Sequence, residues 1–470
     1  MKWEYKVHMK VLLFGCGTYY RRYRHLFDGM QVAAIVDNFS SQKEMDGIPV
    51  LRPKVLEAFD FDCIYLLMAR DFPVYQQLLK LGIPCEKIVR IHDLFRLENF
   101  PRPSFLDGCR RKEGSSGRCM LISNGLSRTG APMVLFSVAC IFRAHGYDVT
   151  VFSPTDGPLH QMYRAQGISV IVDLDMRLGR LDRLPCREYD FVWMNTVLFA
   201  YLLQKRRCRL PVFWWIHEAE KFYAEADTAL TGEEWKGVHA FCVSGWAAQN
   251  FKRLVPQGSQ HMDGIFPYGI PDARMQETTH HGKLTFAIIG TMGKIKGQAF
   301  FLSVWRRVFS SAPSVELYLV GGGDEGSSEL REIQLAADGC ENVRFLGELS
   351  HDEVLRLYSE IDVLVCPSMD DPLPVVATEA MMNARPCLVS DHTGTADFIK
   401  PDVNGWVFHM GDTKDLERKL LEIVAQKEHL PEVGRQARKC YEEHFSYAAF
   451  EKRVLEAAQC MMKEGSLHDE

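Results

Sequence analysis

Two carboxylates, Asp371 and Glu379, lie eight positions apart in the second half of the chain. The proline-rich stretch between them predicts a turn after a buried strand, and then a helix that begins near Val375. Backbone N–H groups at a helix start can hold an anion, so this segment could present two acids and an anion site to one polar ligand. The alternative is that Asp370 or Asp371 only caps the helix.

A second segment, residues 290–298, combines glycines with the cationic side chains of Lys294 and Lys296. Between a strand and a helix, such a loop would offer backbone amides and ammonium groups to a phosphate. A surface loop with two solvated lysines has the same composition. The spacing alone therefore leaves both interpretations open.

Two features in the middle of the chain complete the set of candidate site residues. The loop 123–130 ends at Gly130 and precedes a helical stretch, Ala131–His145, while the strand Val212–Ile216 is followed by His217. A glycine there would let the backbone approach a ligand closely, and a histidine there could exchange protons or hydrogen bonds with one. A plain turn and a core histidine are the alternatives.

The buried runs of the sequence predict three α/β units in succession. Each opens with a strand, a glycine-containing loop and a helix, starting near Lys10, Arg118 and Leu284, which is the rhythm of a parallel sheet. Ligands of such sheets bind beyond the carboxyl ends of the strands, where all these segments would lie. We expect a Rossmann-like domain at 1–98, a linker at 99–117, two facing domains at 118–278 and 279–447, and a helical tail at 448–470.

Composition narrows the class of protein. With 470 residues, 47% of them hydrophobic, the chain can bury several cores, and its net charge of −6 argues against a nucleic-acid partner. Its fourteen cysteines show neither a C-x-x-C pair nor zinc spacing, which favours free thiols and no metal. We expect a cytoplasmic protein without a signal peptide or membrane span. Basic runs at 110–112 and 205–209 leave peripheral contact with an inner membrane open.

Taken in order, these segments resemble the retaining GT-B glycosyltransferases of family 4, over roughly residues 118–463. Residues 371–379 are similar to that family's E-x₇-E motif, with Asp371 in place of the first Glu. Residues 290–297 are similar to its G-R-x-x-x-x-K-G loop, with Thr291 at the Arg and Lys296 at the Lys. The resemblance implies a GT-B fold of two facing Rossmann-like domains, preceded here by a smaller one.

The activity that the resemblance implies is metal-independent transfer of a sugar with retention of anomeric configuration. The donor would be a UDP- or GDP-linked nucleotide sugar, and the acceptor a glycan or polyprenyl-linked oligosaccharide used in cell-surface polysaccharide biosynthesis. The departures at Thr291 and Asp371 leave a second interpretation, a catalytically weak protein that binds nucleotide sugars.

The resemblance also assigns roles to individual residues. Asp371 would contact the donor sugar, Glu379 the nucleotide ribose and Lys296 the diphosphate, while His217 would lie beside the reacting sugar. Further donor contacts would come from backbone and side-chain groups on both facing domains. These residues are Gly130, Thr291, Lys294, Gly347, Leu373, Pro374 and Val375.

The beginning of the chain resembles a dinucleotide-binding fingerprint. Gly15 and Gly17 follow a strand, and Asp37 ends the next strand, although Tyr20 stands where the third glycine is expected. Three interpretations stay open: binding of NAD or another nucleotide, an NAD-dependent sugar-modifying activity, and a purely structural accessory domain.

Overall fold

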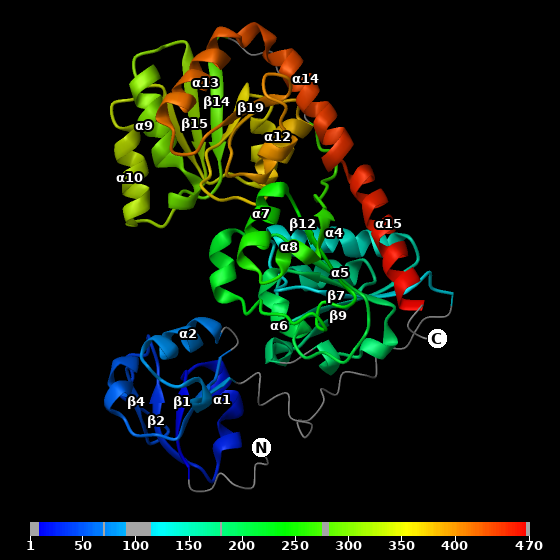
Figure 1. The fold of residues 1–470 in the computed structure, drawn as a ribbon. Helices are drawn as coiled ribbons and strands as arrows, with labels where there is room; N and C mark the ends of the chain where they lie inside the picture. The colour runs from blue at the N-terminus through cyan, green and yellow to red at the C-terminus, as the bar shows by residue number, and fades with distance from the viewer. Residues whose placement is uncertain (1–8, 69–70, 91–113, 179–180, 275–281, 467–470) are drawn as a thin grey trace.

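The computed structural model describes residues 9–68, 71–90, 114–178, 181–274 and 282–466 (Figure 1). Three sheets follow one another along the chain, and each is the centre of a lobe. Figure 1 shows the first lobe in blue, the second in cyan and green, and the third in yellow-green to orange, with the last helix returning to the second lobe. The predicted α/β fold class is confirmed.

The first sheet has the strand order β3-β4-β2-β1-β5-β6, with β3 and β4 antiparallel and the other pairs parallel. Its elements are β1 (Lys10–Phe14), α1 (Thr18–Tyr23), β2 (Gln31–Val36), β3 (Glu44–Met45), β4 (Ile48–Leu51), β5 (Cys63–Leu66), α2 (Phe72–Lys80) and β6 (Ile88–Arg90). The predicted linker at 99–117 and the basic run at 110–112 fall largely or wholly outside the described residues.

The second sheet is parallel, in the order β13-β12-β11-β10-β7-β8-β9. Its strands are β7 (Arg118–Ile122), β8 (Asp148–Ser153), β9 (Ser169–Val172), β10 (Phe191–Asn195), β11 (Val212–Ile216), β12 (Val238–Cys242) and β13 (Met262–Ile265). Its helices are α4 (Gly130–Ala144), α5 (Leu159–Ala165), α6 (Ala200–Leu203), α7 (Gly245–Leu254) and α8 (Gly258–His261).

The third sheet is also parallel, in the order β16-β15-β14-β17-β18-β19. Its strands are β14 (Leu284–Ile289), β15 (Val315–Val320), β16 (Val343–Gly347), β17 (Val363–Cys366), β18 (Cys387–Ser390) and β19 (Gly405–Phe408). The helices that follow are α9 (Gln298–Phe309), α10 (Ser328–Ala337), α11 (His351–Leu357), α12 (Val375–Met382), α13 (Thr413–Ala425), α14 (Leu430–Cys440) and α15 (Tyr447–Ser466).

The second and third sheets share one topology, and the first follows it except for the antiparallel pair of β3 and β4 at its edge. In each, the chain starts at a central strand, builds outward on one side, and then crosses to the other side of that strand. The direction changes between β1 and β5, between β7 and β10, and between β14 and β17. Ligands of doubly wound sheets bind at the carboxyl ends of the strands at such a change of direction. The fold therefore offers three candidate sites of one kind.

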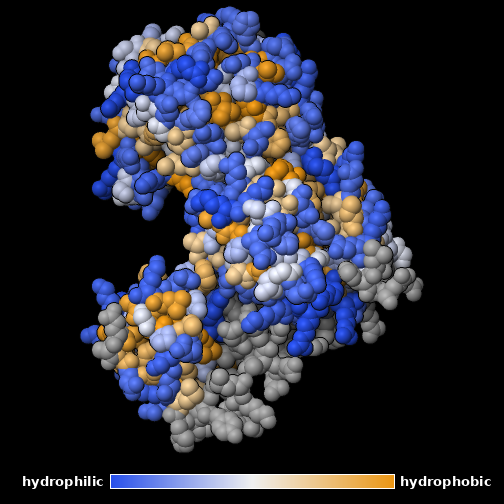
Figure 2. Space-filling model, viewed as in Figure 1, coloured by the Kyte–Doolittle hydropathy of each residue, from blue (hydrophilic) through white to orange (hydrophobic). Residues whose placement is uncertain are grey.

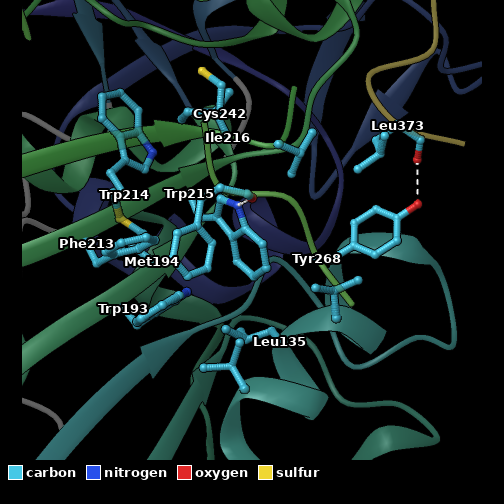
Figure 3. Packing of buried hydrophobic residues seen from close by; sticks show 14 of the residues in the cluster. Leu135, Trp193, Met194, Phe213, Trp214, Trp215, Ile216, Cys242, Tyr268 and Leu373 are labelled. Carbon is cyan, nitrogen blue, oxygen red and sulfur yellow. Dashed lines mark hydrogen bonds between the residues drawn. The ribbon is translucent and has the colours of Figure 1, made fainter. Parts of the chain in front are cut away.

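Aromatic packing fixes the strands that carry the second of these positions. Trp193, Trp214 and Trp215 in β10 and β11 are fully buried, and Trp193 stacks on Phe213 with ring centroids 3.8 Å apart (Figure 3). Strands buried on both faces read as continuous apolar runs, which explains why they were recognisable in the sequence. This packing holds the strand ends beyond which His217 lies.

The chain passes between the second and third lobes at two segments that touch. Ile270 N–H donates to the Phe445 carbonyl at 2.9 Å, and the Tyr441 hydroxyl donates to the Ile270 carbonyl at 2.9 Å. A Cβ on Gly269 would lie 2.4 Å from Phe450 Cβ. The predicted tail at 448–470 begins here, and within it α15 packs against α4 and β10 of the second lobe (Figure 1).

Ion pairs fasten the first lobe to the second. Arg22 lies 2.9 Å from Asp175, and Arg90 bridges Asp71, at 2.7 Å, and Asp227. Figure 2 shows that this face of the molecule is largely hydrophilic and that its outline is deeply indented between the first and third lobes. Across the described residues, no helix combines the length and the apolar character needed to cross a bilayer.

Candidate functional site

Lys296 and Asp371 meet at the carboxyl ends of β14 and β17, where the third sheet changes direction. Lys296 Nζ lies 2.7 Å from Asp371 Oδ2, and Asp371 is only 9% exposed. Burial opposes the charge on the lysine, but the carboxylate outweighs it and raises the pKa of Lys296 above its usual value. The two residues assigned to diphosphate and sugar therefore form one ion pair.

Backbone contacts hold the two loops of this ion pair together. Met369 N–H donates to the Ile295 carbonyl at 2.8 Å. Gly297 has a φ of +70°, and a Cβ at this position would lie 1.8 Å from the Pro367 carbonyl oxygen. Only glycine fits both the left-handed backbone and the close approach.

Gly297→Ala is therefore expected to lower the free energy of unfolding by about 2–3 kcal/mol, because it combines backbone strain with overpacking. Chemical denaturation of the purified variant measures this change. Gly339→Ala is the matched control, because Gly339 has a φ of +76° in the same lobe with no atom within 4 Å of the added Cβ. Equal losses for the two variants would contradict the close approach.

Glu379 is held by two neighbouring side chains. Its Oε2 accepts a hydrogen bond from the Tyr358 hydroxyl at 3.0 Å, and its Oε1 lies 2.8 Å from His351 Nε2. Glu379 is 6% exposed, whereas the His351 side chain is 68% exposed. Burial, and then the charge of Glu379, raise the pKa of Tyr358 well above its usual value, so its hydroxyl stays a donor. The carboxylate is fixed in place at the edge of solvent.

The helix α12, which carries Glu379, begins at Val375, as the sequence predicted. Pro374 is its N-cap residue, and no side chain caps it. The alternative in which Asp370 or Asp371 caps the helix is therefore wrong. The Leu373 carbonyl accepts a hydrogen bond from the Tyr268 hydroxyl at 2.9 Å, a contact drawn in Figure 3.

The other predicted donor contacts of the third lobe lie on loops at the same edge of the sheet. Thr291 and Lys294 are exposed on the loop after β14. Gly347 ends β16 with a φ of +73°, and its carbonyl accepts a hydrogen bond from Gly321 N–H at 2.8 Å. These three residues share the carboxyl edge of the sheet with Lys296.

In the second lobe, His217 follows β11 and is half-buried against Trp215, with ring centroids 4.3 Å apart. Its Nε2 is buried and has no hydrogen-bond partner among the described residues. Burial lowers the pKa of His217 to about 3, so the ring is neutral at neutral pH. A neutral ring nitrogen without a protein partner can bind a ligand hydroxyl.

Some polar atoms around His217 have hydrogen-bond partners in the protein, and others have none among the described residues. Glu218 Oε2 accepts from the N–H groups of Val197 and His217, both at 3.0 Å. Asn195 donates through Nδ2 to the Ala131 carbonyl at 2.9 Å, while its Oδ1 is buried and unpartnered among the described residues. Glu218 thus stabilises the loop, whereas Asn195 Oδ1 and His217 Nε2 have no hydrogen-bond partner among the described residues.

Gly130 is the first residue of α4 and is exposed. No atom lies within 4 Å of the position that a Cβ on this glycine would occupy. The protein therefore leaves open the space beside the α4 start, where an anion could approach backbone N–H groups.

Several contacts that sequence reasoning missed join the second lobe to the predicted motif. Asp370 accepts from Trp246 Nε1 at 2.9 Å and from Glu220 N–H at 2.6 Å, and Ser244 Oγ donates to the Pro372 carbonyl at 2.5 Å. These partners are more than 120 positions apart in the chain. A single sequence carries no pattern that could pair them.

In the first lobe, the carboxylate of Asp37, one of the predicted nucleotide-binding residues, accepts hydrogen bonds from the backbone of two loops. Asp37 accepts from the N–H groups of Cys16 at 3.1 Å and of Phe39 and Ser40 at 2.8 Å. Burial opposes its charge, but these hydrogen bonds hold the pKa of Asp37 below its usual value. The Asp37 carboxylate of the fingerprint thus stabilises the loop.

The glycine loop of the first lobe is tight, and the helix after it is short. Gly15 has a φ of +104°, and a Cβ there would lie 3.1 Å from the Leu67 carbonyl oxygen. Gly17 is the N-cap of α1, which is six residues long. Tyr20, at the third glycine position, is 2% exposed and donates to Asp46 at 3.0 Å. Its ring belongs to the core of the lobe.

No three His, Cys, Asp or Glu side chains gather as a metal site within the described ranges.

Comparisons with known proteins cover each lobe. Residues 270–440 match the family "Glycosyl transferases group 1", residues 115–249 match "Glycosyl-transferase family 4", and residues 7–89 match "C2185-like, N-terminal". The first two matches contain the candidate site residues of the second and third lobes.

Curated relatives align over different shares of their length. The uncharacterized glycosyltransferase MJ1607 of Methanocaldococcus jannaschii is 24% identical over 63% of this chain and 81% of its own length. The spore coat protein SA of Bacillus subtilis is 25% identical over 37% of this chain and 48% of its own. The capsular polysaccharide biosynthesis glycosyltransferase CapM of Staphylococcus aureus is 21% identical over 44% of this chain and 55% of its own length. The chain thus spans about half the length of the last two.

Among solved structures, Anabaena Alr3699/HepE in complex with UDP and glucose superposes with a TM-score of 0.57. The match has 15% sequence identity and covers 73% of this chain and 100% of that one. At this identity, the likeness establishes the GT-B fold of the second and third lobes.

Proposed function

The chain belongs to the glycosyl transferases of group 1 and family 4, and from this premise we propose that it moves a sugar from a nucleotide-sugar donor with retention of anomeric configuration and without a metal. The donor lies between the second and third lobes. Its diphosphate faces Lys296, its ribose Glu379 and its sugar Asp371.

The observation that carries this proposal is the ion pair of Lys296 and Asp371, 2.7 Å apart at the change of direction of the third sheet. Leaving of a nucleoside diphosphate builds negative charge on its phosphates, and a catalyst must stabilise that charge. A bound diphosphate competes with Asp371 for Lys296. The freed carboxylate then accepts hydrogen bonds from sugar hydroxyls.

Backbone groups add to the positive end of the site. The starts of α12 at Val375 and of α4 at Gly130 present N–H groups that favour anions. Thr291 and Lys294 extend the same loop edge, and Pro374 and Leu373 set the turn before α12. The N–H groups of the two helix starts, with Lys294 and Lys296, stabilise the charge of the leaving diphosphate without a metal ion.

His217 is proposed to contact the reacting sugar or the acceptor from the second lobe. Because its ring is neutral at neutral pH, Nε2 can accept a hydrogen bond from a hydroxyl without an intervening proton loss. No covalent nucleophile is assigned. An oxygen of the leaving phosphate can receive the proton of the acceptor hydroxyl. The acceptor oxygen then bonds to the anomeric carbon as the bond between that carbon and the phosphate oxygen breaks.

The proposed acceptor is a glycan or polyprenyl-linked oligosaccharide of cell-surface polysaccharide biosynthesis, in line with the similarity to CapM. Cytoplasmic location and peripheral contact with an inner membrane complete the proposal. In the run at 205–209, Lys205, Arg207 and Arg209 are exposed, whereas Arg206 is half-buried. Arg206 donates to the Leu210 carbonyl at 3.1 Å and also to that of Lys236.

For the first lobe we propose an accessory, structural role. The Asp37 carboxylate accepts hydrogen bonds from three backbone N–H groups. The short helix α1 has only a weak dipole to attract a phosphate. Calorimetry with NAD tests this directly, and heat of saturable binding would contradict it.

The proposed function is tested with a panel of UDP-glucose, GDP-mannose, UDP, GDP and NAD. A nucleotide sugar at a hundred times its dissociation constant should stabilise the fold by about 2.7 kcal/mol, visible as a rise in melting temperature. The same donor should then be hydrolysed or transferred at an equal rate with and without EDTA. Absence of any shift would reject the donor site, and loss of turnover in EDTA would reject metal independence.

The same panel separates the second candidate function, a protein that binds nucleotide sugars without turnover. This candidate draws on Thr291 and on the shorter acid at Asp371, whose oxygen is already paired with Lys296. A stabilising nucleotide sugar that is neither hydrolysed nor transferred to any glycan acceptor would favour it.

A further inference from the structure

Trp246, in the first turn of α7, reaches from the second lobe to the donor motif of the third. Its Nε1 donates to Asp370 Oδ1 at 2.9 Å. Its ring stacks on the imidazole of His392, with ring centroids 4.6 Å apart and planes 18° from parallel. One side chain thus contacts two separate segments of the third lobe.

Those two segments hold the backbone of Asp371. Asp370 directly precedes it, and the His392 carbonyl accepts a hydrogen bond from Asp371 N–H at 3.1 Å. His392 Nδ1 donates to the Met369 carbonyl at 3.0 Å, and Gly394 N–H donates to the Asp371 carbonyl at 2.9 Å. The position of the Asp371 carboxylate therefore depends on the segments that Trp246 covers.

Further contacts seat the start of α7 on the same surface. Asp397 Oδ2 accepts from Gly245 N–H at 2.6 Å and from Trp246 N–H at 3.2 Å, which is a favourable charge at a helix N-terminus. A Cβ on Gly245 would lie 2.9 Å from Asp397, and a Cβ on Gly394 would lie 2.3 Å from Ser244 Oγ. Both glycines permit an approach that a side chain would block.

We propose that Trp246 is a positioning residue for Asp371, acting through Asp370 and His392. The proposal rests on the proposed function, in which Asp371 binds the donor sugar. Seating of α7 on the third lobe then sets the carboxylate, so closure between the lobes and recognition of the sugar become one event. When the lobes separate, Asp370 loses the Trp246 donor and the N–H of Glu220, and the loop loses its outer support.

The test compares wild type with Trp246→Phe, which keeps a stacking ring but removes the donor, and with Asp370→Ala, which removes the acceptor. Lys252→Ala is the control, because Lys252 is exposed on the same helix. Turnover is measured with UDP-glucose and GDP-mannose, nucleotide binding with free UDP and GDP, and lobe separation by small-angle X-ray scattering.

We expect Trp246→Phe and Asp370→Ala each to lower kcat about tenfold, since small misplacements of a substrate-positioning group have effects of this order. The dissociation constant of the free nucleoside diphosphate should change less than twofold, because Lys296 and Glu379 are untouched. The double variant should match Asp370→Ala, because Asp370→Ala already removes the hydrogen bond that Trp246→Phe removes, together with the one from Glu220 N–H. Asp370→Asn, which keeps one oxygen, should recover part of the rate.

Wild-type kcat in Trp246→Phe, or equal losses of kcat and of nucleotide affinity, would overturn the proposal. A larger radius of gyration in the variants with unchanged kcat would also overturn it, since the contact would then be only structural. If wild type turns over no donor while the control folds normally, the proposed function fails, and the positioning role fails with it. Only lowered kcat with intact nucleotide binding supports the inference.

Discussion

Lys296→Ala is expected to lower kcat/KM for the donor about a thousandfold, which corresponds to about 4 kcal/mol of lost transition-state stabilisation. The variant loses the cation that we propose faces the leaving diphosphate. It also leaves Asp371, which is 9% exposed and paired with Lys296 at 2.7 Å, as an uncompensated carboxylate that repels the phosphates. Steady-state kinetics with the donor found in the panel measures the loss.

Two comparisons separate these contributions. Lys414→Ala removes an exposed lysine on α13 of the same lobe and should keep wild-type kinetics. Lys296→Ala combined with Asp371→Asn removes the repulsion between the carboxylate and the phosphates but does not restore the cation. It should therefore recover only part of the lost nucleotide affinity. More than a tenth of wild-type kcat/KM in Lys296→Ala would contradict the assignment of this lysine.

The sequence indicated the architecture because parallel strands buried on both faces are visible as short apolar runs. β14, β17 and the start of α12 lie where those runs and the proline-rich turn placed them. The weak strands were missed for a physical reason. Asp46 and Gly47 have positive φ, as in a turn, and β4 starts directly after them although it contains Pro49, a residue that is uncommon inside strands.

The candidate site could be predicted only where its geometry is local. The loop that carries Lys296 and the turn between Asp371 and Glu379 are short, so spacing limits where their side chains can lie. The pairing of Trp246 with Asp370 depends on two lobes meeting, and the fixing of Glu379 by Tyr358 depends on how α11 packs against α12. Neither relation leaves a periodic pattern in the chain.

The first lobe shows how a local pattern can leave several interpretations open. The fingerprint of Gly15, Gly17 and Asp37 has the expected spacing, and Gly15 does make the tight turn. A motif, however, specifies residue types and not their hydrogen-bond partners. The burial of Tyr20 in the core and the three N–H groups that donate to Asp37 depend on tertiary structure, and a motif does not specify them.

Glu379→Ala is expected to raise the dissociation constant of free UDP or GDP about 30-fold, because hydrogen bonds to a charged group contribute about 1.5–3 kcal/mol. The ribose hydroxyls lose their acceptor, while Tyr358 retains the Val376 carbonyl, 3.0 Å from its hydroxyl. Isothermal calorimetry measures the change. Glu417→Ala is the matched control, because Glu417 pairs with Arg307 on the far side of the same lobe at 2.7 Å.

A nucleotide without the ribose hydroxyls shows whether Glu379 contacts the ribose or only shapes the site. Wild type should bind the 2′,3′-dideoxy nucleoside diphosphate about 30-fold more weakly than the parent, because this nucleotide has no ribose hydroxyls to donate to the buried carboxylate. Glu379→Ala should bind both nucleotides alike, since its site holds no acceptor to lose. If the variant still discriminates between them as wild type does, the ribose is bound elsewhere and Glu379 serves only to fix His351 and Tyr358.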